Sequence, residues 1–189
     1  MQDKLTLEEQ KILLRLAREA LTLRVKGEKL PRLELSSLPP RLREEGASFV
    51  TLTIRGELRG CIGALEAYQP LAQDVREHAI AAALEDPRFP PVQERELGAI
   101  QLEVSRLTRP IPLKYKDADD LLSKLKPRVD GVILRDGLRR ATFLPQVWET
   151  LPNPVDFLNH LCQKMGLNAD AWRTKHLEAL TYQVEEFHE

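Results

Sequence analysis

The sequence contains little that would suit a cofactor, a polyanion or a redox site. Only two of its 189 residues are cysteines, Cys61 and Cys162, and in separate segments they form neither a disulfide framework nor the CxxC spacing of zinc sites. The formal net charge of −1 argues against general nucleic-acid binding, which needs many lysines and arginines. Aromatic residues make up only 5%, and no RNA-binding motif is present. The P-loop, Rossmann, HExxH and GxSxG patterns are also missing, so we expect neither a metal nor a cofactor.

Long apolar runs are absent as well. The longest, from Ala79 to Leu84, is far too short to cross a bilayer. The first ten residues lack the charged and then apolar layout of a secretory signal, and two free thiols suit a reducing compartment. We therefore expect a cytoplasmic protein that does not bind a membrane.

The residues that are present have the composition of a globular protein, with 42% hydrophobic and 30% charged residues. The capping-box spacing of Thr6 and Glu9 predicts a helix that ends at Gly27. The proline-rich segment 29–48 predicts a long irregular connection with at most one helical turn. Periodicity and turn residues then predict hairpins at 49–65 and 130–145, the second turning at Asp136-Gly137. They also predict helices at 70–84, 117–126, 153–165 and 169–176, and strands at 100–105 and 180–187.

The two halves of the chain follow one order: a hairpin, a helix and a returning strand. This order predicts a duplicated unit and an α+β fold, in which an antiparallel sheet is flanked by helices. The length suits a single domain, which we expect to have two lobes of about residues 1–115 and 116–189.

The turn of the first hairpin decides where Cys61 points. A three-residue loop at 54–56 keeps the apolar residues of both strands on one face and places Cys61 on the other, with Thr51, Thr53 and Arg59. A two-residue turn at Arg55-Gly56 or Gly56-Glu57 would shift the register by one residue and mix the faces. Consistent patterning favours the three-residue loop.

Cys61 has two interpretations. A free cysteine is commonly a small buried hydrophobe. Three features favour chemistry instead: the polar face, the cation of Arg59, which would stabilise a thiolate, and Gly60 and Gly63, which let a backbone or a ligand approach closely. We therefore predict that Cys61 is a nucleophile, with Arg59, Gly60 and Gly63 contacting the substrate.

Four further residues are candidates for substrate binding. Arg88 lies in the stiff segment DPRFPPV, which is either a rigid turn or a contact for an anionic or planar ligand. Glu103 is either a solvated carboxylate or the partner of Arg59 or Arg88. Arg140 and Thr142 project to the face opposite Ala141 and Phe143, where a solvated sheet surface is the simpler account. His78 lies at helical spacing from apolar residues, which is typical of a packing residue with a partly exposed ring.

The motifs LRGCIGAL, DPRFPPV, DGVIL and RRATFLPQVW occur in this order. With them the chain, from Thr6 to Phe187, resembles the AMMECR-type domain family, and more narrowly its bacterial and archaeal subgroup AmmeMemoRadiSam system protein A. The resemblance implies an α+β fold with a duplicated unit and a cleft near the cysteine motif. It makes residues 58–63 the family signature and gives as further motif positions Arg88, Phe89, Pro90, Arg140, Thr142, Leu144 and Pro145. Other residues occur in the family at the position of His78, which makes His78 a poor candidate for a general base.

The resemblance implies no reaction. The subgroup name records an association with a Memo-type protein and a radical SAM protein, so it implies two partners. We therefore expect an enzyme or enzyme subunit in which Cys61 forms an adduct with a small polar or anionic substrate, Arg88 and Arg140 bind that substrate, and Glu103 orients an arginine. The alternative is a scaffold that docks the two partners and has an inert thiol. Nucleic-acid binding fits the neutral charge least.

Overall fold

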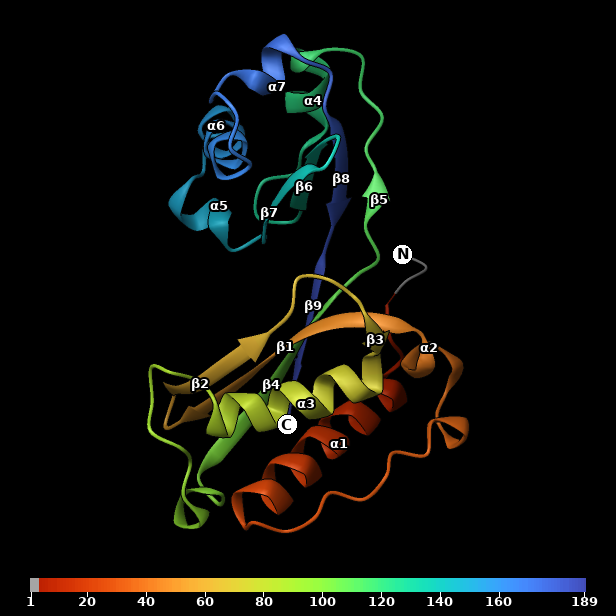
Figure 1. Ribbon diagram of the computed structural model, residues 1–189, viewed down its shortest axis with the longest axis vertical. Helices are drawn as coiled ribbons and strands as arrows, with labels where there is room; N and C mark the ends of the chain where they lie inside the picture. Colours follow the sequence, from red (N-terminus) through yellow and green to blue (C-terminus); the bar gives the residue numbers. More distant parts are fainter. Residues whose placement is uncertain (1–3) are drawn as a thin grey trace. The chain divides into compact units, whose positions relative to one another are not determined.

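The computed structural model describes residues 4–189 and divides the chain into two compact units (Figure 1). The first unit runs up to Thr108 and includes Glu185–Glu189; the second is Arg109–Val184. Each contains an antiparallel sheet flanked by helices, which confirms the expected fold class. The expected order also occurs in each unit, as β1, β2, α3 and β4 in the first and as β6, β7, α6 and β8 in the second.

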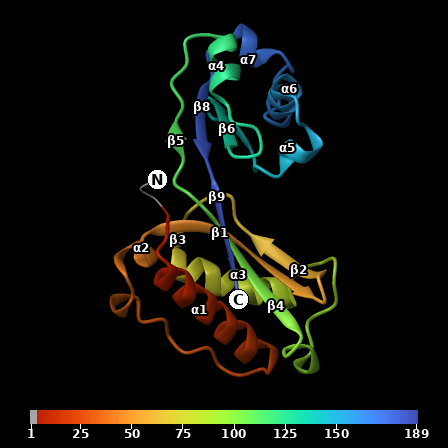
Figure 2. The same ribbon diagram turned by 180° about the vertical axis from the view of Figure 1, so that it is seen from behind.

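The sheet of the first unit has the strand order β2, β1, β4, β9, and β3 pairs with the start of β1. Its strands are β1 (Glu45–Ile54), β2 (Glu57–Gly63), β3 (Gln69–Pro70), β4 (Ile100–Leu107) and β9 (Val184–His188). Helices α1 (Leu7–Val25) and α3 (Leu71–Leu84) pack together on one side of this sheet (Figures 1 and 2). Their apolar residues and those of the sheet form the core, with Leu13, Leu21, Val75, Val50 and Val104 fully buried.

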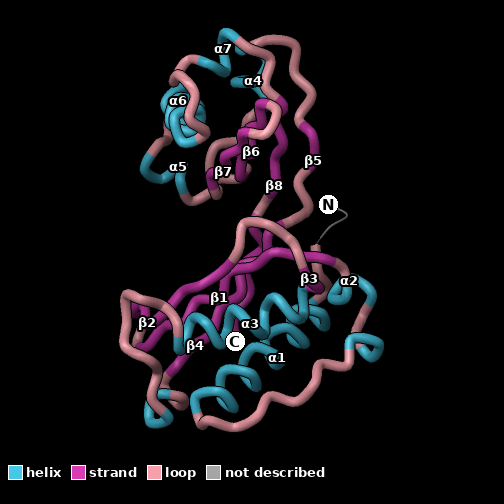
Figure 3. Tube along the Cα trace, in the orientation of Figure 1, coloured by secondary structure: helices cyan, strands magenta, loops and turns pink. Residues whose placement is uncertain are grey.

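The capping box of Thr6 and Glu9 is confirmed. The Glu9 carboxylate accepts from Thr6 N at 2.7 Å, and Glu9 N donates to Thr6 Oγ1 at 3.3 Å. The connection after α1 is irregular, as predicted (Figure 3), but it ends earlier because β1 starts at Glu45, and it contains two short helical turns where at most one was expected. It contains the short 3-10 helix η1 (Leu35–Ser37) and one helical turn, α2 (Pro40–Arg43). A second 3-10 helix, η2 (Glu94–Glu96), precedes β4.

The first hairpin differs from the prediction in its turn. Arg55 and Gly56 form a two-residue turn with φ values of 55° and 84°, so the expected three-residue loop is wrong. Thr53 then pairs with Leu58, and a bulge leaves Arg59 without a cross-strand partner, after which Thr51 pairs with Cys61. The bulge adds one residue and cancels the phase shift of the shorter turn. Cys61 therefore still shares a face with Thr51, as predicted.

The second unit has a four-stranded sheet of order β5, β8, β6, β7. Its strands are β5 (Ile111–Pro112), β6 (Gly131–Asp136), β7 (Arg139–Phe143) and β8 (Glu178–Tyr182), and its helices are α4 (Ala118–Lys124), α5 (Val147–Thr150), α6 (Pro154–Lys164) and α7 (Ala171–Thr174). The core contains Trp148 stacked on Phe157, with ring centroids 3.7 Å apart.

Two details of the second unit differ from the prediction. Asp136 pairs with Arg139, so the turn is Gly137-Leu138 and not Asp136-Gly137. Gly137 has φ 61°, which suits the first central position of a type II′ turn. The predicted strand 180–187 is two strands, because the chain leaves one sheet after Tyr182 and enters the other at Val184. Among residues 4–189, no helix has the length and apolarity needed to span a membrane.

Candidate active site

Cys61, Thr51 and Glu103 form one row across three neighbouring strands. Thr51 of β1 pairs with Cys61 of β2 on one side and with Glu103 of β4 on the other. Cross-strand partners project to the same face of a sheet. The neighbouring residues Val50 and Val104 project into the core under α1 and α3, so the row lies on the opposite face. We call this the polar face, defined by Thr51, Thr53, Cys61, Gln101 and Glu103.

The Cys61 thiol is half-buried and has a polar neighbour in the row. Thr51 Oγ1 donates to Cys61 Sγ at 3.4 Å. Glu103 is half-buried too, and its carboxylate makes no side-chain hydrogen bond or ion pair with any residue of 4–189. The row therefore offers a nucleophile, a hydroxyl and a carboxylate on one face.

The backbone of Cys61 is held by two side chains from the segment after α3. Cys61 N donates to Asp86 Oδ2 at 2.8 Å, and Arg88 Nη2 donates to the Cys61 carbonyl at 3.1 Å. Arg88 also donates to Asp86 through Nε at 2.9 Å and Nη2 at 2.7 Å. We call this arrangement the Asp86–Arg88 clasp. Because β2 is the outer strand of the sheet, the clasp occupies the backbone groups that another strand would otherwise pair with.

The clasp shifts the pKa of both Asp86 and Arg88. The hydrogen bond from Arg88, together with backbone N–H bonds from Cys61 and Arg88, holds the pKa of Asp86 far below its ordinary value of 3.8, although burial opposes this. The hydrogen bond to Asp86 raises the pKa of Arg88, and the charge of Asp86 and of an ionised Cys61 adds to that rise. The hydrogen bond to the Cys61 carbonyl holds the Arg88 guanidinium beside this residue.

Arg59 has a different partner from the one predicted. Its Nε donates to Glu96 Oε1 at 2.8 Å and its Nη2 to Glu96 Oε2 at 3.2 Å, and this hydrogen bonding lowers the pKa of Glu96. Because Asp86 is the partner of Arg88, the prediction that Glu103 orients Arg59 or Arg88 is wrong. Arg59 also lies at the bulge and is neutralised by Glu96, so Arg88 is the cation placed at Cys61.

Gly60 and Gly63 do not open space for a ligand. A Cβ on Gly60 would lie 2.1 Å from the carbonyl oxygen of Ala82 in α3, and a Cβ on Gly63 would lie 2.4 Å from both the Phe49 ring and Ser48 O. Real Cβ contacts are never that short, so both positions are filled by the protein itself. Of the two close approaches that the sequence allowed, by a backbone or by a ligand, the protein's own atoms make the first at both glycines. A substrate contact at Gly60 and Gly63 stays a prediction.

Comparison of the chain with known proteins identifies its family and several relatives. A model of the AMMECR1 family matches residues 14–187. The chain belongs to the AMMECR1 family. A protein of Thermofilum pendens is 40% identical over 202 residues, which cover 97% of this chain and 91% of the relative. A protein of Methanothermobacter thermautotrophicus is 39% identical over 190 residues, covering 98% and 96%. The crystal structure of the uncharacterised protein PH0010 from Pyrococcus horikoshii has a TM-score of 0.73 and 33% identity, covering all of this chain and 93% of that one.

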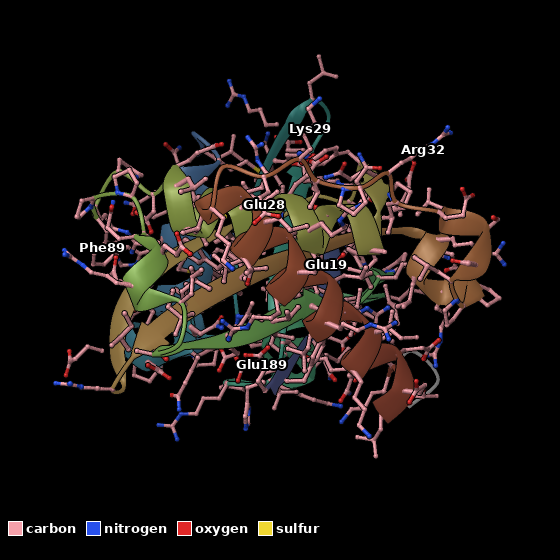
Figure 4. All side chains as sticks on the ribbon, turned by 90° about the horizontal axis from the view of Figure 1, so that it is seen from below. Glu19, Glu28, Lys29, Arg32, Phe89 and Glu189 are labelled. Carbon is pink, nitrogen blue, oxygen red and sulfur yellow. The ribbon has the colours of Figure 1, made fainter. Side chains whose placement is uncertain are left out.

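The other AMMECR1 motif positions lie in different places. The loop after α3 also carries Phe89, at the margin of the first unit in Figure 4, and the Arg88 guanidinium is 5.6 Å from the centroid of its ring. Arg140 and Thr142 belong to the second unit. Thr142 Oγ1 lies 3.0 Å from Tyr182 Oη, on the face of its sheet opposite the buried Ala141. The first unit alone brings together the remaining predicted site residues.

His78 is more buried in this AMMECR1 chain than its spacing indicated, with 8% of its surface exposed. Its Nδ1 lies 3.2 Å from Asp74 Oδ2, and Ser48 Oγ donates to the same oxygen at 2.6 Å. An acyl-transfer triad needs the histidine between the serine and the acid, whereas here the acid is central. These three residues therefore form a polar contact between α3 and β1. Within residues 4–189, no group of three or more His, Cys, Asp or Glu side chains fits a metal ion.

Sequence reasoning missed Asp86 as a site residue. The rigid turn predicted for DPRFPPV is typical of an aspartate that caps a local amide, and Asp86 Oδ1 does accept from Arg88 N at 3.0 Å. The bond to Cys61 N joins residues 25 positions apart, and no local pattern signals it. Glu96 was missed for the same reason, because its link to Arg59 spans 37 positions.

Proposed function

We propose that this AMMECR1-family chain is a cysteine-dependent enzyme or enzyme subunit that forms a covalent adduct with a small polar or anionic substrate. The observation that carries the proposal is the row of Cys61, Thr51 and Glu103 on the polar face, combined with the clasp that fixes the Cys61 backbone. A cysteine that served only as a core hydrophobe would project under α1 and α3, as Val50 does.

Each residue of the row has a role in this proposal. Cys61 is the nucleophile, and the Thr51 hydroxyl donates to its sulfur. Neighbouring strands lie about 4.8 Å apart, so the backbones of Cys61 and Glu103 are separated by roughly 10 Å, twice that spacing. A substrate lying across Thr51 spans this distance. It would meet the thiol at one end and at the other the Glu103 carboxylate, which accepts hydrogen bonds from N–H or O–H groups.

The sequence also names Arg140 and Thr142 as substrate contacts, and these stay part of the proposal. Substituting either residue tests its role without changing any residue of the first unit. Thr142→Val removes the hydroxyl that contacts Tyr182, and Arg140→Gln removes the guanidinium with its charge. A loss of adduct formation with unchanged stability would assign either residue to the substrate.

The narrower resemblance, to AmmeMemoRadiSam system protein A, gives the proposal its context. We place the chain in a pathway with a Memo-type protein and a radical SAM protein, either of which would supply or consume the substrate. In the enzyme proposal the two partners are sequential catalysts, and no stable complex is required.

A docking module is the second candidate, and one observation favours it. Leu58, Leu65 and Tyr68 lie on or just after β2 and are 42%, 38% and 61% exposed. Leu58 pairs with Thr53 and so shares the polar face with Cys61. Exposed apolar side chains that form one contiguous patch are typical of protein contacts, and the docking candidate requires these three to form such a patch. This candidate predicts an inert thiol and a measurable complex with one of the two partners.

Adduct capture separates the two candidates. The purified chain is incubated with the small-molecule fraction of its native cells under a phosphine reductant, which removes disulfides, and its intact mass and peptide map are recorded. The enzyme proposal predicts added mass on Cys61 that the Cys61→Ser variant, with an unchanged melting temperature, does not gain. An unmodified Cys61, together with co-elution of the chain and a purified Memo-type or radical SAM protein, would instead support the docking module.

A further inference from the structure

Asp86 is more completely bonded than a surface loop requires. Its side chain is 2% exposed, and its two oxygens accept from Cys61 N, Arg88 N, Arg88 Nε and Arg88 Nη2 at 2.7–3.0 Å. A buried carboxylate is costly unless its hydrogen bonds are made, and here four donors satisfy it. Two of the four come from the guanidinium and one from the nucleophile's own backbone.

The clasp satisfies the outward backbone groups of Cys61, which water would otherwise solvate. The outward N–H and C=O groups of an edge strand are ordinarily solvated or paired with another strand. At Cys61 a carboxylate and a guanidinium take both groups. The Cys61 backbone, the Asp86 carboxylate and the Arg88 guanidinium are therefore joined in one hydrogen-bonded unit.

The clasp leaves part of Arg88 available. A guanidinium has five N–H donors; Nε and Nη2 serve Asp86 and the Cys61 carbonyl. Nη1 makes no hydrogen bond to any residue of 4–189, and the side chain is 54% exposed. One edge of the guanidinium is therefore held by hydrogen bonds, and the other edge is exposed to solvent beside Cys61. Planar N–H pairs of this kind match the oxygens of a carboxylate or carbonyl.

We propose that Asp86 is a positioning residue, which holds Arg88 so that Nη1 binds a carboxylate oxygen of the substrate next to Cys61 Sγ. This inference rests on the proposed function and narrows its substrate class to small molecules with such an oxygen beside the electrophilic carbon. Because Asp86 offsets the charge of Arg88, recognition depends on hydrogen-bond geometry and not on net positive charge.

Paired alkylating reagents test this inference. Iodoacetate and iodoacetamide each form an S–C bond with the thiolate and release iodide, while the thiol proton passes to the buffer. They differ in whether the group beside the reacting carbon is a carboxylate or an amide. The ratio of their rates at Cys61, read from peptide maps, is divided by the ratio for a free cysteine in a short peptide.

The wild-type chain should give a normalised ratio of roughly five, the factor expected for one hydrogen bond to a charged group in partial contact with water. Asp86→Asn and Arg88→Gln should return it to about one. Arg88→Lys should also lower it, because an amine keeps the charge but cannot bond Asp86 and Cys61 in one plane. Asp120→Asn, which removes a carboxylate paired with Lys124 in the second unit, is the matched control and should leave the ratio at its wild-type value.

Three results would overturn the inference. A wild-type ratio of one that Arg88→Gln leaves unchanged would show that Arg88 does not contact the reagent. A ratio retained in Arg88→Lys and in Asp86→Asn would show that charge alone suffices and that Asp86 positions nothing. The third result is that iodoacetamide reacts with Cys61 no faster than with buried Cys162. This result would overturn the proposed function as well, whereas the first two would overturn only the inference. If Asp86→Asn does not fold, Arg88→Lys decides, since it keeps the charge but loses the planar bonds to Asp86 and Cys61, and the Arg88 side chain is half exposed.

Discussion

Replacing Gly60 with alanine tests whether the first glycine of the LRGCIG motif is required by packing. The added Cβ would lie 2.1 Å from Ala82 O and 3.1 Å from its carbonyl carbon. The obstructing atoms are backbone and cannot rotate away, so α3 must move off β2 by about 1 Å to reach an ordinary contact. Since α3 carries Val75 and Ala79 into the core, we expect the free energy of unfolding to fall by about 3 kcal/mol, the upper end for overpacking.

Urea unfolding followed by circular dichroism measures this change. Gly98→Ala is the matched control, because its Cβ would meet nothing within 4 Å and its φ is not positive. We expect that control to stay within about 0.5 kcal/mol of the wild type. If Gly60→Ala were as stable as Gly98→Ala, the packing account of the motif would be refuted. A contact between Gly60 and a ligand would then be the better explanation of this glycine.

Two further predictions concern acid stability and the second unit. Because Arg88 lowers the pKa of folded Asp86 below 3.8, the stability gained from its ionisation is complete above about pH 5 and is lost as the pH falls through the folded value. The stability advantage of the wild type over Asp86→Asn, measured by urea unfolding at several pH values, should therefore shrink below about pH 4; parallel profiles would contradict this. Gly131→Ala would place a Cβ 2.4 Å from the Tyr182 ring and should cost about 2 kcal/mol. Burial raises the pKa of Tyr182, so absorbance titration should show one tyrosine ionising at lower pH in this variant, and an unchanged titration would refute the contact.

Much of the fold followed from local patterns. The capping box of Thr6 and Glu9 fixed the start of α1, and alternation at Ile100, Leu102 and Val104 marked β4 with the correct inward face. These features depend on neighbours within a few residues, which a sequence displays directly. The order of hairpin, helix and strand in each half was predictable for the same reason.

The hairpin shows where local patterns failed. The turn at Arg55-Gly56 was an alternative that the patterning disfavoured, and the bulge at Arg59 was missed, yet Cys61 lay on the predicted face because the two shifts cancel. The alternation of apolar residues reports which face a residue takes, but not how the chain reaches that register. The bulge also explains why Arg59 turns to Glu96 instead of standing beside Cys61.

The site could be predicted only in part. Cys61 and Arg88 were singled out because their residue types suit chemistry in stiff, glycine- or proline-bounded segments. Asp86 looked like an ordinary turn residue, and its bond to Cys61 depends on how the segment after α3 returns to the edge of β2. Such long-range contacts come from packing, which no single stretch of sequence encodes.

The central claim is that Cys61 is an accessible thiol on the polar face and not a packing residue. The measurement that tests it most directly is the rate of iodoacetamide alkylation at Cys61 in the native chain at pH 7.5, with Cys162 as the internal reference. Cys162 is fully buried and burial raises its pKa. We predict that Cys61 reacts at least about tenfold faster than Cys162 and that urea removes the difference. Equal protection of the two thiols in the native chain would contradict the account and assign Cys61 to packing.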